Sequence, residues 1–120
     1  MELQEQLLGE SKTIAVVGLS PDPERTSHEV AKYLQEHGYR IIPVNPMASE
    51  VLGEKSYPSL EAIPVSVDMV DIFRRSELVM PVVEEAVKIG AKSVWMQDGV
   101  INHEAAALAQ QAGLSVVMDD

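Results

Sequence analysis

Short runs of continuous apolar residues alternate along this chain with segments whose apolar residues recur every three or four positions. Continuous apolar runs that contain β-branched residues are typical of strands buried on both faces of a parallel sheet. These runs predict five strands, at residues 13–18, 39–46, 67–73, 92–97 and 114–119.

The second pattern predicts three helices, at residues 28–38, 81–90 and 102–113. Each segment ends at a glycine, which commonly stands just past a helix C-terminus. Asn102 is a preferred N-cap residue for the third helix. The stretch between the strands at residues 39–46 and 67–73 is irregular. Within it we expect a very short edge strand near residues 55–57, followed by a brief helix that begins at Pro58 and Ser59.

Strands that alternate with helices predict an α/β fold, a Rossmann-like doubly wound parallel sheet with helices on both faces. Right-handed crossovers favour the strand order 3-2-1-4-5-6. We expect a single domain over residues 1–120, because a chain of this length builds one core.

In such a sheet, ligands bind outside the carboxyl ends of the strands, at the point where the strand order reverses. We therefore expect the residues that follow four strand ends to converge on one crevice. They are Gly18, Leu19, Ser20, Val44, Asn45, Pro46, Phe73, Arg74, Arg75, Met96, Gln97, Asp98 and Gly99.

Composition narrows the possible partners. The net charge is −10, which argues against nucleic acid, because a phosphate backbone favours a basic surface. The absence of cysteine excludes disulfides and thiolate metal sites and fits a cytoplasmic setting. No apolar run approaches the roughly 20 residues of a membrane span. Leu3, Leu7 and Leu8 share one helical face, so we expect a short leading helix packed on a monomeric domain.

The ends of the first and second strands limit the nucleotides that could bind. The dinucleotide fingerprint G-x-G-x-x-G and the Walker pattern are both absent. An NAD site places an acid after the second strand to bind the ribose hydroxyls, whereas here no carboxylate follows Val44 until Glu50. That gap suits a nucleotide whose ribose carries its own phosphate, because a carboxylate would repel it. NADP and coenzyme A (CoA) both qualify.

The segment after the first strand has the residues of a phosphate site. Ser20 offers a hydroxyl, and Thr26 and Ser27 begin a helix whose first N–H groups are free to bind an anion. Arg25 adds a planar, permanently charged fork. The alternative is that Thr26 or Ser27 is only an N-cap and that Arg25 pairs with a neighbouring glutamate.

The sequence resembles the small, single-domain CoA-binding proteins, which are similar to the N-terminal domain of the succinyl-CoA synthetase α chain. The resemblance runs from about residue 13 to residue 118. It is carried by VVGLSPDPERTSHEVAKYLQEHGYRIIPVNP, EVLGEKSYPSLEAIP, VDMVDIFRR and AKSVWMQDGVIN.

The resemblance implies roles for the residues at the strand ends. It implies that Gly18, Leu19 and Ser20 line the CoA phosphate loop with Arg25 nearby. It also implies that Val44, Asn45, Pro46, Phe73 and Arg74 flank the nucleotide, and that Met96, Gln97 and Asp98 correspond to a synthetase segment that contacts CoA. Relatives commonly carry a basic residue just after V-N-P, where this chain has Met47 and Ala48.

No catalytic constellation is visible in the sequence. His28, His37 and His103 are interpreted as exposed residues at helix ends, and the acids are scattered over helix faces. The favoured function is therefore binding of CoA or acyl-CoA without catalysis. Two alternatives stay open: an NADP-type oxidoreductase, and a degenerate acyl-CoA ligase subunit that acts only with an ATP-grasp partner.

Overall fold

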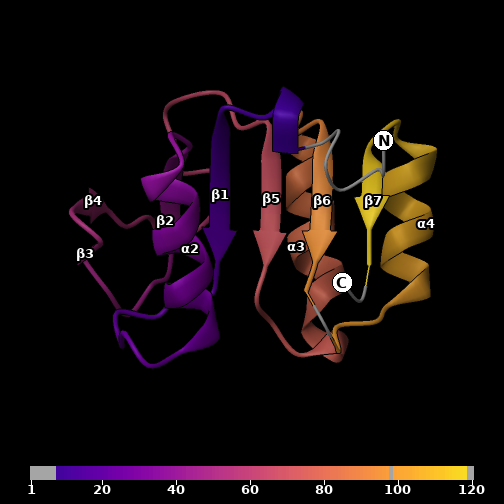
Figure 1. Ribbon diagram of the computed structural model, residues 1–120. Coiled ribbons are helices and arrows are strands. Elements are labelled where there is room, and N and C mark those ends of the chain that lie inside the picture. Colours follow the sequence, from indigo (N-terminus) through magenta and orange to yellow (C-terminus); the bar gives the residue numbers. More distant parts are fainter. Residues whose placement is uncertain (1–7, 98, 119–120) are drawn as a thin grey trace.

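A five-stranded parallel sheet forms the centre of the computed structural model, which describes residues 8–97 and 99–118 (Figure 1). Its strands lie in the order β2-β1-β5-β6-β7, and every neighbouring pair is parallel. Their bounds are β1 (Thr13–Val17), β2 (Arg40–Val44), β5 (Met69–Ile72), β6 (Ser93–Met96) and β7 (Ser115–Val117). The Rossmann-like α/β prediction is confirmed. The carboxyl ends of all five strands lie along the same side of the sheet, which we call the carboxyl edge (Figure 1).

Helices cover both faces of the sheet. Helix α2 (Thr26–Glu36) packs on one face beside β1 and β2, whereas α3 (Val79–Lys88) and α4 (His103–Gln111) pack on the other (Figure 1). A short 3-10 turn, η1 (Ser76–Leu78), leads into α3. Asn102 caps α4 as predicted, because its Oδ1 accepts a hydrogen bond from the N–H of Ala105 (3.0 Å). Among the described residues, no helix has the length and apolar character needed to cross a membrane.

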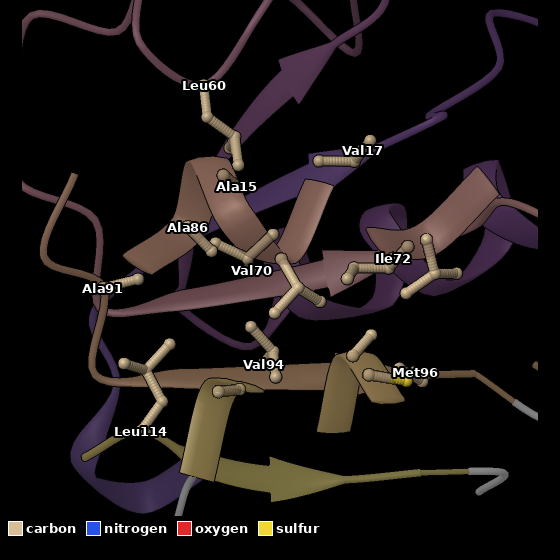
Figure 2. Close-up of a cluster of buried hydrophobic side chains, with 14 of the residues drawn as sticks. Ala15, Val17, Leu60, Val70, Ile72, Ala86, Ala91, Val94, Met96 and Leu114 are labelled. Atoms are coloured by element: carbon tan, nitrogen blue, oxygen red, sulfur yellow. The ribbon is translucent and has the colours of Figure 1, made fainter. Parts of the chain in front are cut away.

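Alternate strand residues supply two cores, one on each face. Figure 2 shows the larger, where Val70 and Ile72 of β5 meet Val94 and Met96 of β6 beneath α3 and α4. The opposite face of β5 carries Met69 and Asp71, toward the core under α2. A buried carboxyl side chain thus sits in an otherwise apolar strand.

The stretch between β2 and β5 differs from the expectation. Strands β3 (Glu50–Val51) and β4 (Glu54–Lys55) form an antiparallel hairpin, and the expected edge strand is reduced to a single parallel bridge between Tyr57 and Val44.

The brief helix expected at Pro58 and Ser59 is wrong, since residues 58–62 form bends and a turn. The N–H groups of Leu60 and Glu61 instead donate to the carboxylate of Glu85 in α3 (3.1 and 3.3 Å). Pro64 also disfavours helical geometry in the residue before it, which leaves too few residues for a helix.

The expected leading helix is described only at its end. Residues 8–10 are helical, and the half-buried Leu8 packs on the core beneath α2. Leu3 and Leu7 lie outside the described residues.

Candidate functional site

Gly18 follows β1 at the carboxyl edge and lies against the end of β5. Its φ is +86°, a conformation that favours glycine, and its N–H donates to the carbonyl oxygen of Val44 (3.0 Å). A Cβ at this position would collide with the carbonyl oxygen of Phe73. Glycine therefore allows the ends of β1, β2 and β5 to approach closely, which brings their loops together.

Hydrogen bonds of the loop itself hold the segment from β1 to α2. The buried Oγ of Ser27 accepts from the N–H of Ser20 (3.0 Å), and the Oγ of Ser20 accepts from the N–H of Asp22 (3.0 Å). Nδ1 of His28 lies 2.9 Å from the carbonyl oxygen of Ser20. The interpretation of His28 as an exposed histidine is thus wrong, because the half-buried ring braces this loop from the first turn of α2. His37 and His103 are exposed, as expected.

The first turn of α2 presents free donors and an exposed arginine. Arg25, with extended backbone, is the N-cap residue, and its side chain makes no capping hydrogen bond. Thr26 and Ser27 lie ahead of the first intrahelical donor, His28, so their N–H groups have no partner within the helix. Within residues 8–97 and 99–118, Arg25 forms no ion pair with either of the glutamates nearest in sequence. The alternative of an N-cap threonine or serine beside a paired arginine is therefore wrong.

Two adjoining cavities lie along the carboxyl edge. The first has a volume of about 550 Å³ and is lined by Gly18, Ser20, Glu24, Arg25, Thr26, Ser27 and Phe73. The second, of about 520 Å³, is lined by Thr26, Phe73, Arg74, Arg75, Gln97, Gly99 and Val100. Thr26 and Phe73 line both, so the two cavities adjoin at these residues.

These cavities gather positive charge on an acidic chain. Among the residues that the structure describes, three arginines and one glutamate line them, whereas the whole chain carries −10. Arg75 is partly engaged by Glu77 (3.5 Å), on a well-exposed surface where the pair contributes little. Arg25 and Arg74 are thus the cations best placed to meet an anion.

Several expected site residues lie near the edge but do not line these cavities. Leu19, Val44 and Met96 are buried in the two cores, so only their backbone lies at the edge. Asn45 braces the loops, because its Nδ2 donates to the carbonyl oxygen of Leu19 (3.0 Å) and its Oδ1 accepts from the N–H of Met47 (2.8 Å). Pro46 is exposed, and Asp98 lies outside the described residues.

The sequence interpretation left Glu24 and Val100 out of the site. Glu24 follows Asp22 in a tight turn, with its N–H donating to the Asp22 carboxylate (3.0 Å), and this turn brings it to the rim of the first cavity. Val100 lies one residue past Gly99, the last residue that was expected to follow the strand at 92–97. The sequence signal for both was weak, since neither follows a strand directly.

A third, smaller cavity of about 180 Å³ lies between α2 and the sheet. Asp71 and Gln97 line it, and Nε2 of Gln97 donates a hydrogen bond to Oδ1 of Asp71. Burial raises the pKa of Asp71 to about 7, against the opposing effect of the Gln97 hydrogen bond. A carboxyl group that takes up a proton near neutral pH therefore lies beside the carboxyl edge.

Other surfaces of the described chain offer less. A cavity of about 440 Å³ on α3 is lined by three glutamates, a lysine, Pro81 and Val82, and shares no residue with the edge cavities. No group of three or more histidine, cysteine, aspartate or glutamate side chains within the described ranges could hold a metal ion.

Comparison with known proteins agrees with this geometry. A family model described as a CoA binding domain matches residues 12–120. The chain belongs to this CoA binding domain family. The resemblance inferred from the sequence is thereby confirmed, and the family includes segments of ADP-forming acetate–CoA ligases.

Three similar proteins illustrate the range of the family. The uncharacterized protein YneT of Bacillus subtilis is 47% identical over 114 residues, which cover 95% of this chain and 84% of YneT. A solved structure of a hypothetical protein from Pyrococcus horikoshii superposes with a TM-score of 0.93 at 49% identity, covering 96% of this chain and 81% of that one.

The third is the alpha subunit of acetate–CoA ligase [ADP-forming] II from Pyrococcus furiosus. It is 39% identical over 82 residues, which cover 68% of this chain but only 18% of the subunit. The chain thus corresponds to a small part of that ligase subunit.

Proposed function

We propose that this protein binds CoA or an acyl-CoA at the carboxyl edge of its sheet and catalyses no reaction by itself. The observation that carries the proposal is the first turn of α2. There, N–H groups that have no partner within the helix lie beside Arg25, which forms no ion pair with any residue that the structure describes. Gly18 of the preceding loop keeps the end of β5 close.

The phosphates and the pantetheine arm of CoA have matching groups along the two adjoining cavities. The N–H groups of Thr26 and Ser27 and the guanidinium of Arg25 would hold the pyrophosphate, because helix N-termini and arginine forks both favour phosphate oxygens. Arg74 would add charge beside Phe73. The pantetheine arm would then extend toward Gln97.

The adenosine end would lie beside the end of β2, near Val44, Asn45 and Pro46. Asn45 presents no negative charge there, which supports a ligand with a phosphorylated ribose over NAD. Met47 is 91% exposed at the position where a basic residue would strengthen contact with that phosphate. Binding of the 3′-phosphate is therefore expected to depend on the arginines of the neighbouring loops.

The ligase relatives favour a second candidate function. Because the chain corresponds to under a fifth of the Pyrococcus furiosus ligase subunit, it could supply CoA to a separate ATP-grasp chain. Co-purification of an ATP-grasp protein with the tagged native chain would support this role. Recovery of the protein alone, with CoA bound, would support the simple binding module.

Calorimetric titration tests the main proposal directly. We expect heat of binding and saturation with CoA, weaker binding of dephospho-CoA, and no saturable binding of NAD. The order follows from the ribose phosphate, which only the first of these ligands carries. Tighter binding of NADP than of CoA would overturn the assignment in favour of an oxidoreductase.

A further inference from the structure

The third cavity adjoins the proposed CoA site at Gln97, but its chemistry is different. Gln97 lines both this cavity and the second cavity of the carboxyl edge. From there the cavity extends over the face of β5 and β6 beneath α2. Its apolar lining comes from α2, the sheet and the end of the leading helix, and consists of Leu8, Val30, Tyr33, Leu34, Met69 and Trp95.

From the first cavity to the third, the lining side chains change from charged to apolar. The first is lined by Arg25 and helix N–H groups, the second by Arg74, Arg75 and Gln97, and the third mainly by hydrocarbon side chains. An acyl-CoA has the same order of chemistry, from phosphates through the pantetheine amides to the acyl chain.

We propose that the third cavity holds the acyl chain of an acyl-CoA, and that this acyl chain is short and uncharged. This inference rests on the proposed CoA site. The acyl chain would pass Gln97 and lie against Trp95, Val30 and Met69. Asp71 would form part of the cavity wall.

The volume of the third cavity limits the length of the acyl chain. An apolar protein cavity of about 150 Å³ can hold benzene, which has six carbon atoms. The volume of about 180 Å³ here therefore fits an acyl chain of about four to six carbons.

Asp71 limits the charge that the acyl chain can carry. Its carboxyl is 3% exposed, and no lysine or arginine lines the cavity among the described residues. A second carboxylate, such as that of a dicarboxylic acyl group, would lie beside Asp71 with no cation to offset it. An uncharged chain leaves Asp71 free to stay protonated, in keeping with its raised pKa.

A calorimetric series with the full-length chain tests the proposal. The ligands are CoA, acetyl-CoA, butyryl-CoA, hexanoyl-CoA, palmitoyl-CoA and succinyl-CoA. Burial of two further methylenes predicts that butyryl-CoA binds about tenfold more tightly than acetyl-CoA. We expect no further gain from hexanoyl-CoA to palmitoyl-CoA. Succinyl-CoA has the same four-carbon length as butyryl-CoA and should bind at least about tenfold more weakly, because its carboxylate would be buried unpaired.

A cavity-filling variant locates the effect. Val30→Phe should abolish the advantage of butyryl-CoA over acetyl-CoA while leaving the affinity for CoA itself within about twofold. Val82→Phe is the matched control, since Val82 is a half-buried residue of α3 on the opposite side of the sheet. It should retain the tenfold advantage. If Val30→Phe fails to fold, as thermal melting would show, the ligand series on the native chain still decides.

The outcomes separate this inference from the proposed function. Failure of CoA to bind would overturn both. Binding of CoA with equal affinity for acetyl-, butyryl- and succinyl-CoA would overturn the acyl cavity alone. Retention of the butyryl advantage in Val30→Phe would also overturn it, because the chain would then lie elsewhere.

Discussion

At the scale of the single residue, Arg25 is the side chain whose contact with a CoA phosphate is easiest to test. It is exposed, unpaired within the described ranges and placed at the N-cap of α2. Arg25→Ala should weaken CoA binding by about 1.5–3 kcal/mol, or roughly 10- to 150-fold, through loss of charge-assisted hydrogen bonds. Arg25→Lys should recover only part of the loss, because an ammonium lacks the planar fork. Calorimetry on the three proteins measures both effects.

The matched control is Arg40→Ala. Arg40 is also exposed, but it is the first residue of β2. It therefore lies at the amino ends of the strands, opposite the carboxyl edge. Neither substitution should change the free energy of unfolding by more than about 0.5 kcal/mol, since both side chains lie on the surface. Equal CoA affinity in Arg25→Ala and the native chain would contradict the phosphate site.

Asp71 makes stability depend on pH. Its pKa is raised by burial from 3.8 to about 7, so the folded state holds a proton that the unfolded state releases. The protonated form stabilises the fold fully below about pH 4, and this contribution is lost as pH rises through 7. In Asp71→Asn the side chain cannot ionise but still accepts from Gln97. The free energy of unfolding of Asp71→Asn relative to the native chain should therefore rise by about 3 kcal/mol from pH 5 to pH 8.

Urea unfolding of both proteins at the two pH values measures this difference. Subtracting one protein from the other removes the effect of the other carboxylates, which both share. Tyr33 is the other titratable side chain that the described structure places on this cavity. A difference that stays constant from pH 5 to pH 8 would mean that Asp71 is ionised throughout.

At the scale of the elements, the cap of α4 also ties two loops together. Oδ1 of Asn102 accepts from the N–H of Ala105, while its Nδ2 donates to the carbonyl oxygen of Ser76 in η1 (3.0 Å). Asn102→Ala loses both bonds and should lower the free energy of unfolding by about 1–2 kcal/mol. Asn102→Asp keeps the cap acceptor and should lose only part of this. Denaturant unfolding that ranks the two variants equally would contradict a capping role.

The elements that the sequence predicted are those with a strong local signal. Continuous apolar runs identified all five strands of the sheet, and the glycine stops identified the helix ends to within about two residues. The failure at Pro58 has a tertiary cause. Its backbone donors are satisfied by Glu85, which is distant in sequence, so no local pattern could indicate the turn.

The convergence of the strand-end residues could be predicted from the sequence, but the direction of each side chain could not. Gly18, Ser20, Arg25, Ser27, Phe73, Arg74 and Gln97 line the edge cavities because strand ends converge there. Leu19 and Met96 follow the same rule but face the cores, since residue-by-residue alternation decides the face. The cavity beside Asp71 depends on packing between α2 and two strands, which the sequence does not encode locally.

For the whole molecule, charge distribution opposes ligand binding at long range and favours it at the site. The chain carries −10 and CoA is anionic, but exposed charges beyond about 8 Å are screened at physiological ionic strength. In the proposed site, contacts with Arg25 and Arg74 are therefore expected to dominate binding. CoA affinity should fall as salt is raised from 50 to 500 mM, and less steeply in Arg25→Ala. An affinity that rises with salt would show that the overall negative charge governs binding instead.

Both margins of the sheet offer little backbone to a further strand. Pro43 lies in β2 and has no N–H, its carbonyl oxygen already accepts from Tyr57 (3.0 Å), and the segment that follows β2 covers this side. At the other margin, β7 is only three residues long. Unpaired strand margins are the usual starting points for fibrils and for exchange between neighbouring molecules. The covered β2 side and the short β7 therefore leave little unpaired backbone through which two copies of this chain could join sheet to sheet.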